Sequence, residues 1–396
     1  MANVSSSNGL EKRPKLRFPG FDEPWQSTLL SSVFTKNTKK NTDGQITNVI
    51  CNSAKQGLIP QREYFDKDIA NSDNTSGYYI IEENDFVYNP RKSADAPYGP
   101  ISRYKYAEAG IVSPLYLCFR AKKEINPSFF EWYFRSSAWH RYVYISGDSG
   151  ARHDRVSIKD DTFFAMPINL PSAHEQEHIA SFLERIDQRI EKQRALVESL
   201  KKYKRGLVKA LISGTVAFAC SENKRWETVR LAEIFTISAG GDIDRQNSSP
   251  TYSTSYPYPV YANALTNNGL YGYANYFKVE GDSITVSGRG EVGHAIARHC
   301  KYVPIVRLLS LVPKYEDDVD FFAYMINATS IYIESTGVPQ LTSPQLGAVK
   351  VFRPPILEQK RISSLLLKID AKIENEERLT FYLEKIRSSM LQQLFI

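Results

Sequence analysis

The sequence contains one long segment twice, and this repeat constrains the fold more than any other feature. Residues 175–212 align without a gap with residues 358–395, and both copies begin with Glu-Gln. Neither copy contains proline, and apolar residues recur at heptad spacing, as in a helix that buries one face against another helix. These positions are Ile179, Leu183, Ile186, Ile190, Val197, Leu200, Leu207 and Leu211 in the first copy, and Ile362, Leu366, Ile369, Ile373, Leu383, Met390 and Leu394 in the second. The repeat predicts two long helices that pair as a coiled coil.

The ends of both helices carry sequence signals. Ser172 stands three residues before Glu175, which is the spacing of a capping box, and Gly214 is a C-terminal cap candidate. Pro354 and Pro355 open the second helix, where a missing N–H is tolerated. The alternative is two amphipathic helices that pack on separate cores. If a pseudo-twofold axis relates the two halves, the helices run antiparallel, and 38 residues at a rise of ~1.5 Å make a rigid spacer of roughly 57 Å.

The segments before the two helices correspond as well, because Trp25 matches Trp226 and Phe129–Phe130 matches Phe321–Phe322. Both middles combine strand and helix patterns, so the predicted fold class is α+β in each half. We expect strands within 77–88, 110–120, 273–286 and 302–313, and helices over 126–134 and 319–327. The predicted parts are an N-terminal arm (1–24), a first globular domain (25–171), a first helix (172–214), a second globular domain (215–353) and a second helix (354–396).

Composition excludes several protein classes. The chain has 396 residues, of which 42% are hydrophobic and 24% charged, so it can build two or three cores and is not wholly disordered. No apolar run approaches the ~18 residues of a membrane span, and the polar first residues do not resemble a secretory leader. The four cysteines lie far apart, which favours reduced thiols in the cytoplasm. A formal charge of +6 is a mild bias toward an anionic partner.

Together these features resemble the specificity (S) subunit of type I restriction–modification enzymes, and the resemblance extends over nearly the whole chain. It rests on the duplicated order of domain, helix, domain, helix. It also rests on short motifs: Leu16-Arg17-Phe18-Pro19-Gly20-Phe21 ahead of Trp25, Pro171 ahead of Glu175-Gln176, Pro354-Pro355 ahead of Glu358-Gln359, and Ser335-Thr336-Gly337 with Pro339-Gln340-Leu341.

The resemblance implies that two target-recognition domains each read one half of a bipartite DNA site, and that an antiparallel coiled coil helps to set the spacer between the halves. It also implies a chain without catalytic activity or cofactor of its own. Two modification subunits would methylate adenine with S-adenosylmethionine, and restriction subunits would use ATP and Mg²⁺. Independently of the family, the two halves of the chain correspond to each other except in their middle segments. This difference predicts an asymmetric double-stranded target. Two reading domains on a rigid spacer should contact one duplex face about one helical turn, ~34 Å, apart.

Side chains that read base edges and phosphates in DNA are mostly Arg, Lys, Asn and Gln in loops. In the first domain the candidates are Arg91, Lys92, Arg103, Lys105, Arg152 and Arg155. In the second they are Asn267, Asn268, Arg289, His294, Arg298 and Gln340. Arg91 and Arg289 each follow an Asp-x-apolar strand start, which suggests related loops. For any single candidate, a solvated surface charge is the alternative.

Two motifs imitate enzyme sites. His174-Glu175-Gln176-Glu177-His178 fits the zinc-protease pattern H-E-x-x-H, but no third ligand is evident and Leu357 and Arg361 occupy the repeat-equivalent positions. Residues 288–293 fit G-x-G-x-x-G, but strand-like residues follow where a nucleotide site needs a helix. We therefore expect a turn between strands that presents Arg289 to DNA, and the alternative is a purely structural turn.

Methyltransferase chemistry lacks its usual motifs here. Asn89-Pro90 begins like the Asn-Pro-Pro-Tyr motif of amino-methyltransferases, but the second proline and the aromatic residue are missing. No ATP-binding G-x-x-x-x-G-K-[ST] loop is present either. The remaining alternatives to a specificity subunit are a zinc or nucleotide enzyme, and a coiled-coil scaffold with two protein-binding domains.

Overall fold

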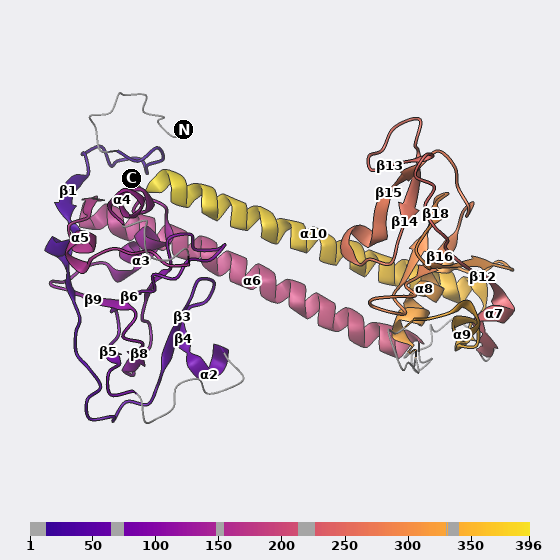
Figure 1. Ribbon diagram of the computed structural model, residues 1–396, viewed down its shortest axis with the longest axis horizontal. Coiled ribbons are helices and arrows are strands. Elements are labelled where there is room, and N and C mark those ends of the chain that lie inside the picture. Colours follow the sequence, from indigo (N-terminus) through magenta and orange to yellow (C-terminus); the bar gives the residue numbers. More distant parts are fainter. Residues whose placement is uncertain (1–12, 65–74, 148–153, 213–225, 330, 332–339) are drawn as a thin grey trace. The chain divides into compact units, whose positions relative to one another are not determined.

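The computed structural model describes residues 13–64, 75–147, 154–212, 226–329, 331 and 340–396 (Figure 1). The chain divides into two compact units. The first comprises residues 1–193 and 379–396, and the second comprises residues 194–378. Each unit therefore contains a globular part and one end of each of two long helices, α6 (Ala173–Ile212) and α10 (Ile356–Leu394). Among the described residues, no helix has a stretch long and apolar enough to cross a bilayer.

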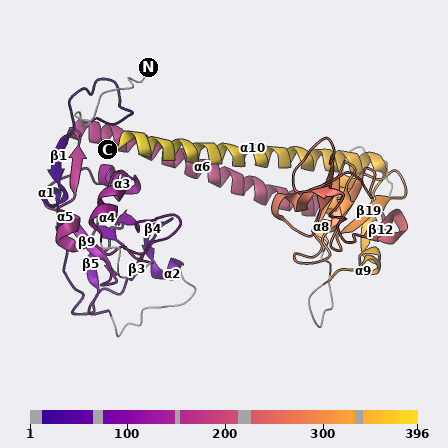
Figure 2. The same ribbon diagram turned by 45° about the horizontal axis from the view of Figure 1, so that its top comes forward.

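The globular part of the first unit is built on a four-stranded antiparallel sheet in the order β2-β9-β6-β7. Three two-stranded pairs surround it: β1 with β10, β3 with β4, and β5 with β8. The partners β3 and β4 lie side by side in both ribbon views (Figures 1 and 2). The strands are β1 (Gln26–Leu29), β2 (Phe34–Lys36), β3 (Ile50–Ser53), β4 (Gly57–Pro60), β5 (Tyr79–Ile81), β6 (Phe86–Tyr88), β7 (Ile101–Arg103), β8 (Gly110–Val112), β9 (Leu117–Ala121) and β10 (Pro167–Leu170); the short helices are α1 (Leu30–Val33), α2 (Gln61–Tyr64), α3 (Pro127–Arg135), α4 (His140–Ser146) and α5 (Asp160–Phe164).

The second unit repeats this frame. Its antiparallel sheet has the order β12-β19-β16-β17, which is the order of the first sheet strand for strand, and β11 pairs with β20 as β1 pairs with β10. A second four-stranded sheet, β13-β15-β14-β18, lies in the middle segment of this unit, where the two halves of the chain differ. The elements are β11 (Glu227–Arg230), β12 (Phe235–Ala239), β13 (Ser248–Ser249), β14 (Tyr258–Tyr261), β15 (Leu270–Ala274), β16 (Ser283–Val286), β17 (Ala295–Arg298), β18 (Val303–Pro304), β19 (Leu309–Pro313) and β20 (Lys350–Arg353), with α7 (Leu231–Ile234), η2 (Thr266–Gly269), α8 (Val319–Ala328) and α9 (Ser343–Gly347).

One amphipathic helix packs on each sheet, and both form where the sequence predicts them. In α3 the side chain of Asn126 accepts a hydrogen bond from the backbone N–H of Phe129, and in α8 Asp318 accepts one from Phe321. These caps satisfy N–H groups that a helix start leaves unpaired. The helices predicted over 126–134 and 319–327 are thus confirmed, with Pro127 tolerated in the first turn of α3.

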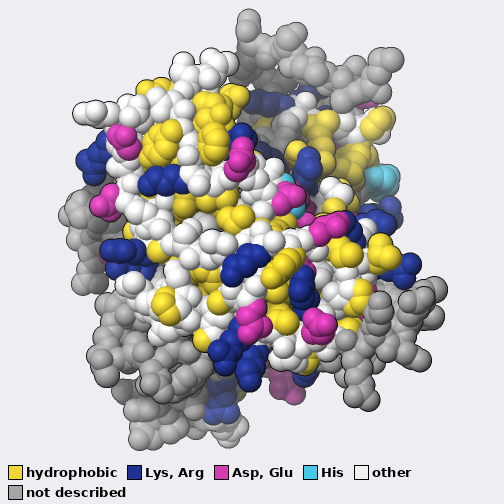
Figure 3. Space-filling view, turned by 90° about the vertical axis from the view of Figure 1, so that its right-hand side faces the viewer, with side chains coloured by type: hydrophobic (Ala, Val, Ile, Leu, Met, Phe, Trp, Pro, Cys, Tyr) yellow, Lys and Arg dark blue, Asp and Glu magenta, His cyan; other side chains and the backbone are white. Residues whose placement is uncertain are grey.

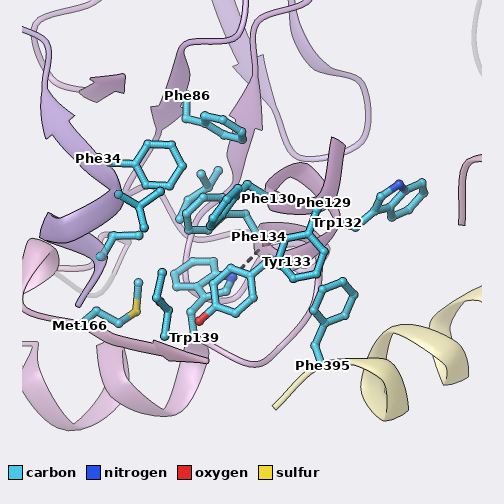
Figure 4. Packing of buried hydrophobic residues seen from close by; sticks show 14 of the residues in the cluster. Phe34, Phe86, Phe129, Phe130, Trp132, Tyr133, Phe134, Trp139, Met166 and Phe395 are labelled. Atoms are coloured by element: carbon cyan, nitrogen blue, oxygen red, sulfur yellow. Dashed lines mark hydrogen bonds between the residues drawn. The ribbon is translucent and has the colours of Figure 1, made fainter. Parts of the chain in front are cut away.

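The core of the first unit is largely aromatic (Figure 4). The ring of Phe34 meets those of Phe86, Phe119 and Phe130 edge to face, with centroids 5.0–5.4 Å apart. Such pairs add about 0.5–1.5 kcal/mol each beyond their buried area. The ring of Phe395, just beyond α10, packs against that of Phe129 at a tilt, with centroids 5.5 Å apart, so the residue that follows α10 belongs to this core. The core of the second unit contains more aliphatic side chains around the pair Phe235–Phe322.

The predicted strands lie in the right places, but the structure divides each of them in two. Residues 77–88 form β5 and β6, which belong to different sheets, because Asn84 between them has a left-handed φ of 70°. Residues 110–120 divide into β8 and β9, and 273–286 into the end of β15 and all of β16. Residues 302–313 are interrupted at Val306 and Arg307, which also have positive φ. In each case the pattern predicted extended chain and missed the change of sheet.

The long helices begin as predicted, except at one contact. Ser172 Oγ accepts a hydrogen bond from the backbone N–H of Glu175, but the Glu175 carboxylate does not return to close a capping box. It is instead 1% exposed and receives two hydrogen bonds of 2.8 Å from the guanidinium of Arg17. The repeat-equivalent Glu358 accepts one from Trp226 Nε1 at 3.0 Å. Both glutamates therefore fasten the chain that enters their own domain. Gly214 lies outside the described residues.

The apolar heptad positions face inward in both helices, since all fifteen are buried or half-buried. In the first unit Ile179 and Leu183 share a core with Leu394. In the second unit Leu211 shares one with Ile362 and Leu366. Each unit thus joins the beginning of one long helix to the end of the other, so the helices run in opposite directions where they meet.

Repeat-equivalent ion pairs link the helices within each unit. Asp187 binds Arg387 in the first unit, and Lys204 binds Asp370 at 2.5 Å in the second. Asp370 matches Asp187 in the repeat, and Arg387 matches Lys204. In the first unit Arg135 of α3 also binds Asp187, at 3.2 Å. Burial opposes the charged form of Asp187, but these two guanidinium groups outweigh it and lower the pKa of the carboxyl below its usual value.

Candidate nucleic-acid interface

The two domains present polar loops from equivalent strands. β6 lies second from one edge of the first sheet and is followed by the loop that carries Arg91. β16 has the same place in the second sheet and is followed by the loop that carries Arg289. The expectation that Arg91 and Arg289 occupy related loops is therefore confirmed by the strand order.

In the first unit, backbone pairing assembles cations from two distant segments. The N–H of Lys92 donates to the carbonyl of Asp154, and the N–H of Val156 donates to that of Pro90, both at 2.8 Å. This ladder sets Arg91 opposite Arg155. The three predicted side chains Arg91, Lys92 and Arg155 consequently lie in one place. Arg152 lies outside the described residues.

The cations line a groove of about 890 Å³. Lys55 contributes a fourth positive charge, and Asp95, the acidic residue among the described lining, pairs with Lys55 at 3.6 Å. Asn52 supports the groove from below: its amide donates to the carbonyls of Val87 and Pro100 and is 6% exposed. An excess of positive charge beside polar groups suits a phosphate backbone, and Arg and Lys side chains can also donate to base edges beside it.

Arg103 and Lys105 lie at the other end of β7, because Arg103 is paired with Phe86 while Tyr88, next to the groove, is paired with Ile101. Arg103 donates to Asn84 Oδ1 at 2.8 Å and to Ser128 Oγ at 3.0 Å. It is 17% exposed, so its guanidinium holds β7 against α3. Lys105 pairs with Glu131 at 2.7 Å and keeps more than half of its surface in solvent.

In the second unit the glycine-rich motif is the loop of a hairpin. β16 pairs antiparallel with β17 through Val286 and Ala295, so residues 287–294 connect two strands, as predicted, and do not open a helix. The guanidinium of Arg289 donates two hydrogen bonds, of 3.1 and 2.9 Å, to Gln340 Oε1. Two predicted side chains from distant segments therefore meet. Asn263 Oδ1 accepts the N–H of Gly288 at 2.8 Å and fixes the loop.

A second loop of this unit presents Asn267 and Asn268, both exposed and both with a φ of 51°. Asparagine is among the residues that accept this left-handed conformation. Arg298 holds the loop, because its Nη2 donates to the carbonyl of Asn268 at 2.7 Å while its Nε donates to Thr285 Oγ1. Arg298 is only 7% exposed, and burial lowers the pKa of its guanidinium. Its side chain is in position to orient the loop from inside.

His294 is exposed at the end of the hairpin loop. Partial burial lowers the pKa of its imidazole below the usual 6.5, against the opposing charge of Glu291. It is therefore neutral near pH 7 and offers one hydrogen-bond donor and one acceptor rather than a positive charge.

Positive charge is not gathered into one patch on the face shown in Figure 3, where Lys and Arg side chains are scattered among uncharged, apolar and acidic ones. Sequence reasoning missed Asn52, Asn263 and Arg307, which support or adjoin these loops. Asn52 lies within strand β3, and Asn263 lies in a loop, where asparagine signals only a turn. The sequence offered no signal for their long-range partners.

The zinc-like motif does not assemble a catalytic site. His174 Nε2 and His178 Nε2 lie 3.2 Å apart on the surface of α6, but both oxygens of Glu175 are held by Arg17. The carboxylate is thus unavailable as a base. Within the described part of the chain, no three His, Cys, Asp or Glu side chains cluster as metal ligands.

The chain matches the type I restriction modification DNA specificity domain twice, over residues 23–201 and 223–385. It belongs to this family. Each match covers one globular part and most of the long helix that follows it, so the two specificity domains coincide with the two halves of the internal repeat.

Curated relatives carry the same family name. A protein of Mycoplasma pneumoniae named as a type I specificity subunit is 26% identical over 62% of this chain and 64% of its own length. One of Methanocaldococcus jannaschii, named as a type I restriction enzyme specificity subunit, is 27% identical over 61% of each. The chain thus spans just under two thirds of these relatives.

Solved structures extend the likeness of fold to almost the whole chain. The S subunit of a type I restriction–modification system from M. genitalium superposes with a TM-score of 0.59 at 16% identity, covering 97% of this chain and 99% of that one. A chain from a structural study of complex assembly in the type I R-M system gives 0.63 at 17% identity, covering 95% and 98%. At these identities the specificity-family fold is shared.

Proposed function

We propose that this chain is the DNA sequence-specificity subunit of a type I restriction–modification complex and has no catalytic activity of its own. One observation carries the proposal: the same sheet occurs twice and presents unlike side chains from equivalent loops. The first domain offers the cationic groove of Arg91, Lys92 and Arg155. The second offers Arg289 bonded to Gln340. Different side chains recognise different bases, so the target is bipartite and asymmetric.

The long helices are the spacer between the two half-sites. In support, the ion pairs Asp187–Arg387 and Lys204–Asp370 are repeat-equivalent and keep one antiparallel register. An antiparallel coiled coil that continues this register through both helices would hold the recognition domains at a fixed separation. Forty residues of α6 at a rise of ~1.5 Å span about 60 Å.

The chemistry belongs to partner subunits. Two modification subunits with S-adenosylmethionine would dock on this chain and methylate adenine N6, and restriction subunits with ATP and Mg²⁺ would complete the nuclease, all in the cytoplasm. A docked specificity subunit directs the methyl group by binding the duplex next to the adenine. The family of the chain and its motif content favour this division of labour.

The test is to co-express the full chain with its modification subunit and to map N6-methyladenine in the host DNA. We expect a split motif of two short unlike blocks around a fixed gap. A soluble complex that methylates no split motif would contradict the proposal. Affinity of the complex for the mapped duplex should also fall steeply between about 50 and 200 mM salt, since phosphate contacts release counterions. A protein-binding scaffold would lack that dependence.

Variants can then assign the blocks to the domains. Arg91→Ala with Lys92→Ala should relax one block, and Arg289→Ala should relax the other. Lys123→Ala, an exposed cation outside both loops, is the matched control. If the variants of both domains altered the same block, the assignment of one half-site to each domain would be wrong.

A further inference from the structure

A turn in the second unit has a backbone conformation that its own residues disfavour. The N–H of Leu308 donates to the carbonyl of Ile305 at 3.0 Å, and the two residues between them, Val306 and Arg307, have φ of 52° and 63°. Two successive left-handed residues are typical of a type I′ turn, which favours asparagine and glycine. A β-branched residue such as valine is a genuine outlier there.

The same unit shows what sequence this conformation ordinarily takes. Asn267 and Asn268 form the other pair of successive non-glycine residues with positive φ among those described, with φ of 51° each. Asparagine suits that backbone because its short polar side chain is tolerated in the left-handed region. Backbone preference therefore explains Asn267–Asn268, and it does not explain Val306–Arg307.

The surrounding structure holds the strained turn firmly. The N–H of Val306 donates to Gly241 at 2.9 Å, the N–H of Arg307 donates to Gly240 at 3.0 Å, and Asn263 Nδ2 donates to the carbonyl of Val306. A Cβ at Gly240 would lie 2.6 Å from the carbonyl carbon of Pro304, so only glycine permits this approach. Strain that the surroundings impose in this way is characteristic of functional positions.

The two strained side chains point outward and contribute little to a core. Val306 is 47% exposed, and Arg307 is also exposed. The turn lies beside the hairpin loop, because a Cβ at Gly288 would be 2.7 Å from the carbonyl oxygen of Arg307. Gly288 precedes Arg289, so the turn adjoins the Arg289–Gln340 pair. A rigid isopropyl group next to a guanidinium matches two parts of duplex DNA, the thymine methyl and the phosphate.

We propose that Val306 and Arg307 form a DNA-reading turn of the second recognition domain. Val306 packs against the C5-methyl group of a thymine in the half-site, and Arg307 binds a backbone phosphate. This inference rests on the proposed function. The strained backbone is kept because it aims a non-polar side chain that neither glycine nor asparagine could replace.

The Val306 contact can be tested with one variant and one change in the DNA. The full complex is assayed on the mapped duplex and on duplexes in which uracil replaces each thymine of the half-site in turn. One uracil should weaken the unsubstituted complex about fourfold, the factor that corresponds to one buried methyl group. Val306→Gly should bind the thymine duplex about fourfold more weakly and should not distinguish uracil from thymine.

Thermal unfolding separates this role from a structural one. Val306→Gly should raise the melting temperature, because glycine adopts positive φ without steric cost. Val306→Asn is a second variant that keeps the turn and removes the isopropyl group. A gain in stability together with a loss of thymine discrimination supports a reading role. A purely structural valine would give no change in discrimination.

Arg307→Gln tests the phosphate contact. It should weaken binding to all duplexes alike and reduce the salt slope by about one. Equal binding of thymine and uracil duplexes by the unsubstituted complex, or an unchanged salt slope in Arg307→Gln, would overturn the inference while the split methylation motif still stood. Absence of any split motif would instead overturn the proposed function, and the inference with it.

Discussion

The buried guanidinium of Arg298 allows a quantitative prediction about how the second domain holds the loop of Asn267 and Asn268. It donates two hydrogen bonds, to Thr285 Oγ1 at 2.9 Å and to the carbonyl of Asn268 at 2.7 Å, and lies 3.7 Å from the ring centroid of Tyr261. Arg298→Met removes all three contacts and keeps an apolar stem. Charged hydrogen bonds contribute about 1.5 kcal/mol each and the cation–π contact about 1 kcal/mol. Relief of the buried charge offsets part of this sum, which leaves a loss of roughly 2–3 kcal/mol.

This loss should be visible in thermal unfolding of the full chain. For a unit of this size, each kcal/mol lowers the melting temperature by about 2–4 °C, so the transition should fall by roughly 4–12 °C. Because Arg298 orients the Asn268 loop from inside, the salt slope of DNA binding should not change. Arg289→Met is the matched control: its side chain is exposed, so the melting temperature should stay nearly constant.

The reverse result would refute this reasoning. If Arg298→Met left the melting temperature unchanged and reduced the salt slope by about one, the guanidinium would be contacting a phosphate. Hydrogen exchange at the N–H of Asn268 gives an independent readout, since a loop without its support should open more often.

Three further predictions follow from the same structure. Arg289→Ala should weaken DNA binding or relax one half-site by roughly 1–3 kcal/mol, measured by titration with the mapped duplex; unchanged affinity and target would exclude a contact. One heptad added to 175–212 and to the matching place in the second helix should lengthen the spacer by about 10 Å, or roughly three base pairs, in the methylation map; a new half-site with the old gap would contradict the proposal that the long helices set the spacer. Burial opposes protonation of His299, but Asp282 and Asp320 outweigh it and raise its pKa above 6.5. The stabilising effect of the protonated imidazole is therefore present below pH 6.5 and lost as pH rises through the raised pKa. His299→Gln should flatten this part of the plot of melting temperature against pH, and an unaltered plot would contradict a stabilising role of His299.

The sequence predicts the long helices well because their pattern is local and long. Thirty-eight aligned positions with heptad spacing define α6 and α10 to within a few residues. The helices α3 and α8 were also predictable, since Asn126 and Asp318 precede apolar helical patterns. The strands were predicted less accurately than the helices. A left-handed Asn84 is an expected turn signal, but Val306 and Arg307 carry none, so the break before β19 could not be seen.

The candidate interface was predictable in composition but not in contacts. Arg91 and Arg155 are both cations near turn residues, yet only the ladder between 90–92 and 154–156 brings them together. Arg103 and Arg298 looked the same in sequence, and the structure gives both of them internal partners. Residue type alone cannot separate a reading arginine from one that holds a loop, because the distinction lies in long-range partners. The DNA contacts themselves stay predictions.

The division between repeated and unrepeated contacts suggests how such a chain can change its target. Several structural features occur in both units: the strand order of the sheet, the N-terminal caps of α3 and α8, and the hydrogen bonds that hold Glu175 and Glu358. Contacts that position the loops occur once, such as those of Asn52 in the first unit and Asn263 in the second. A loop transplanted alone would leave the buried amide of Asn52 or the half-buried amide of Asn263 without partners, which is costly. A whole domain bounded by the β11–β20 pair carries its supports with it. If the proposed function is right, we therefore expect the exchangeable element to be the domain rather than the loop. A domain exchange should then replace one half-site in the methylation map and leave the other half-site and the spacer unchanged.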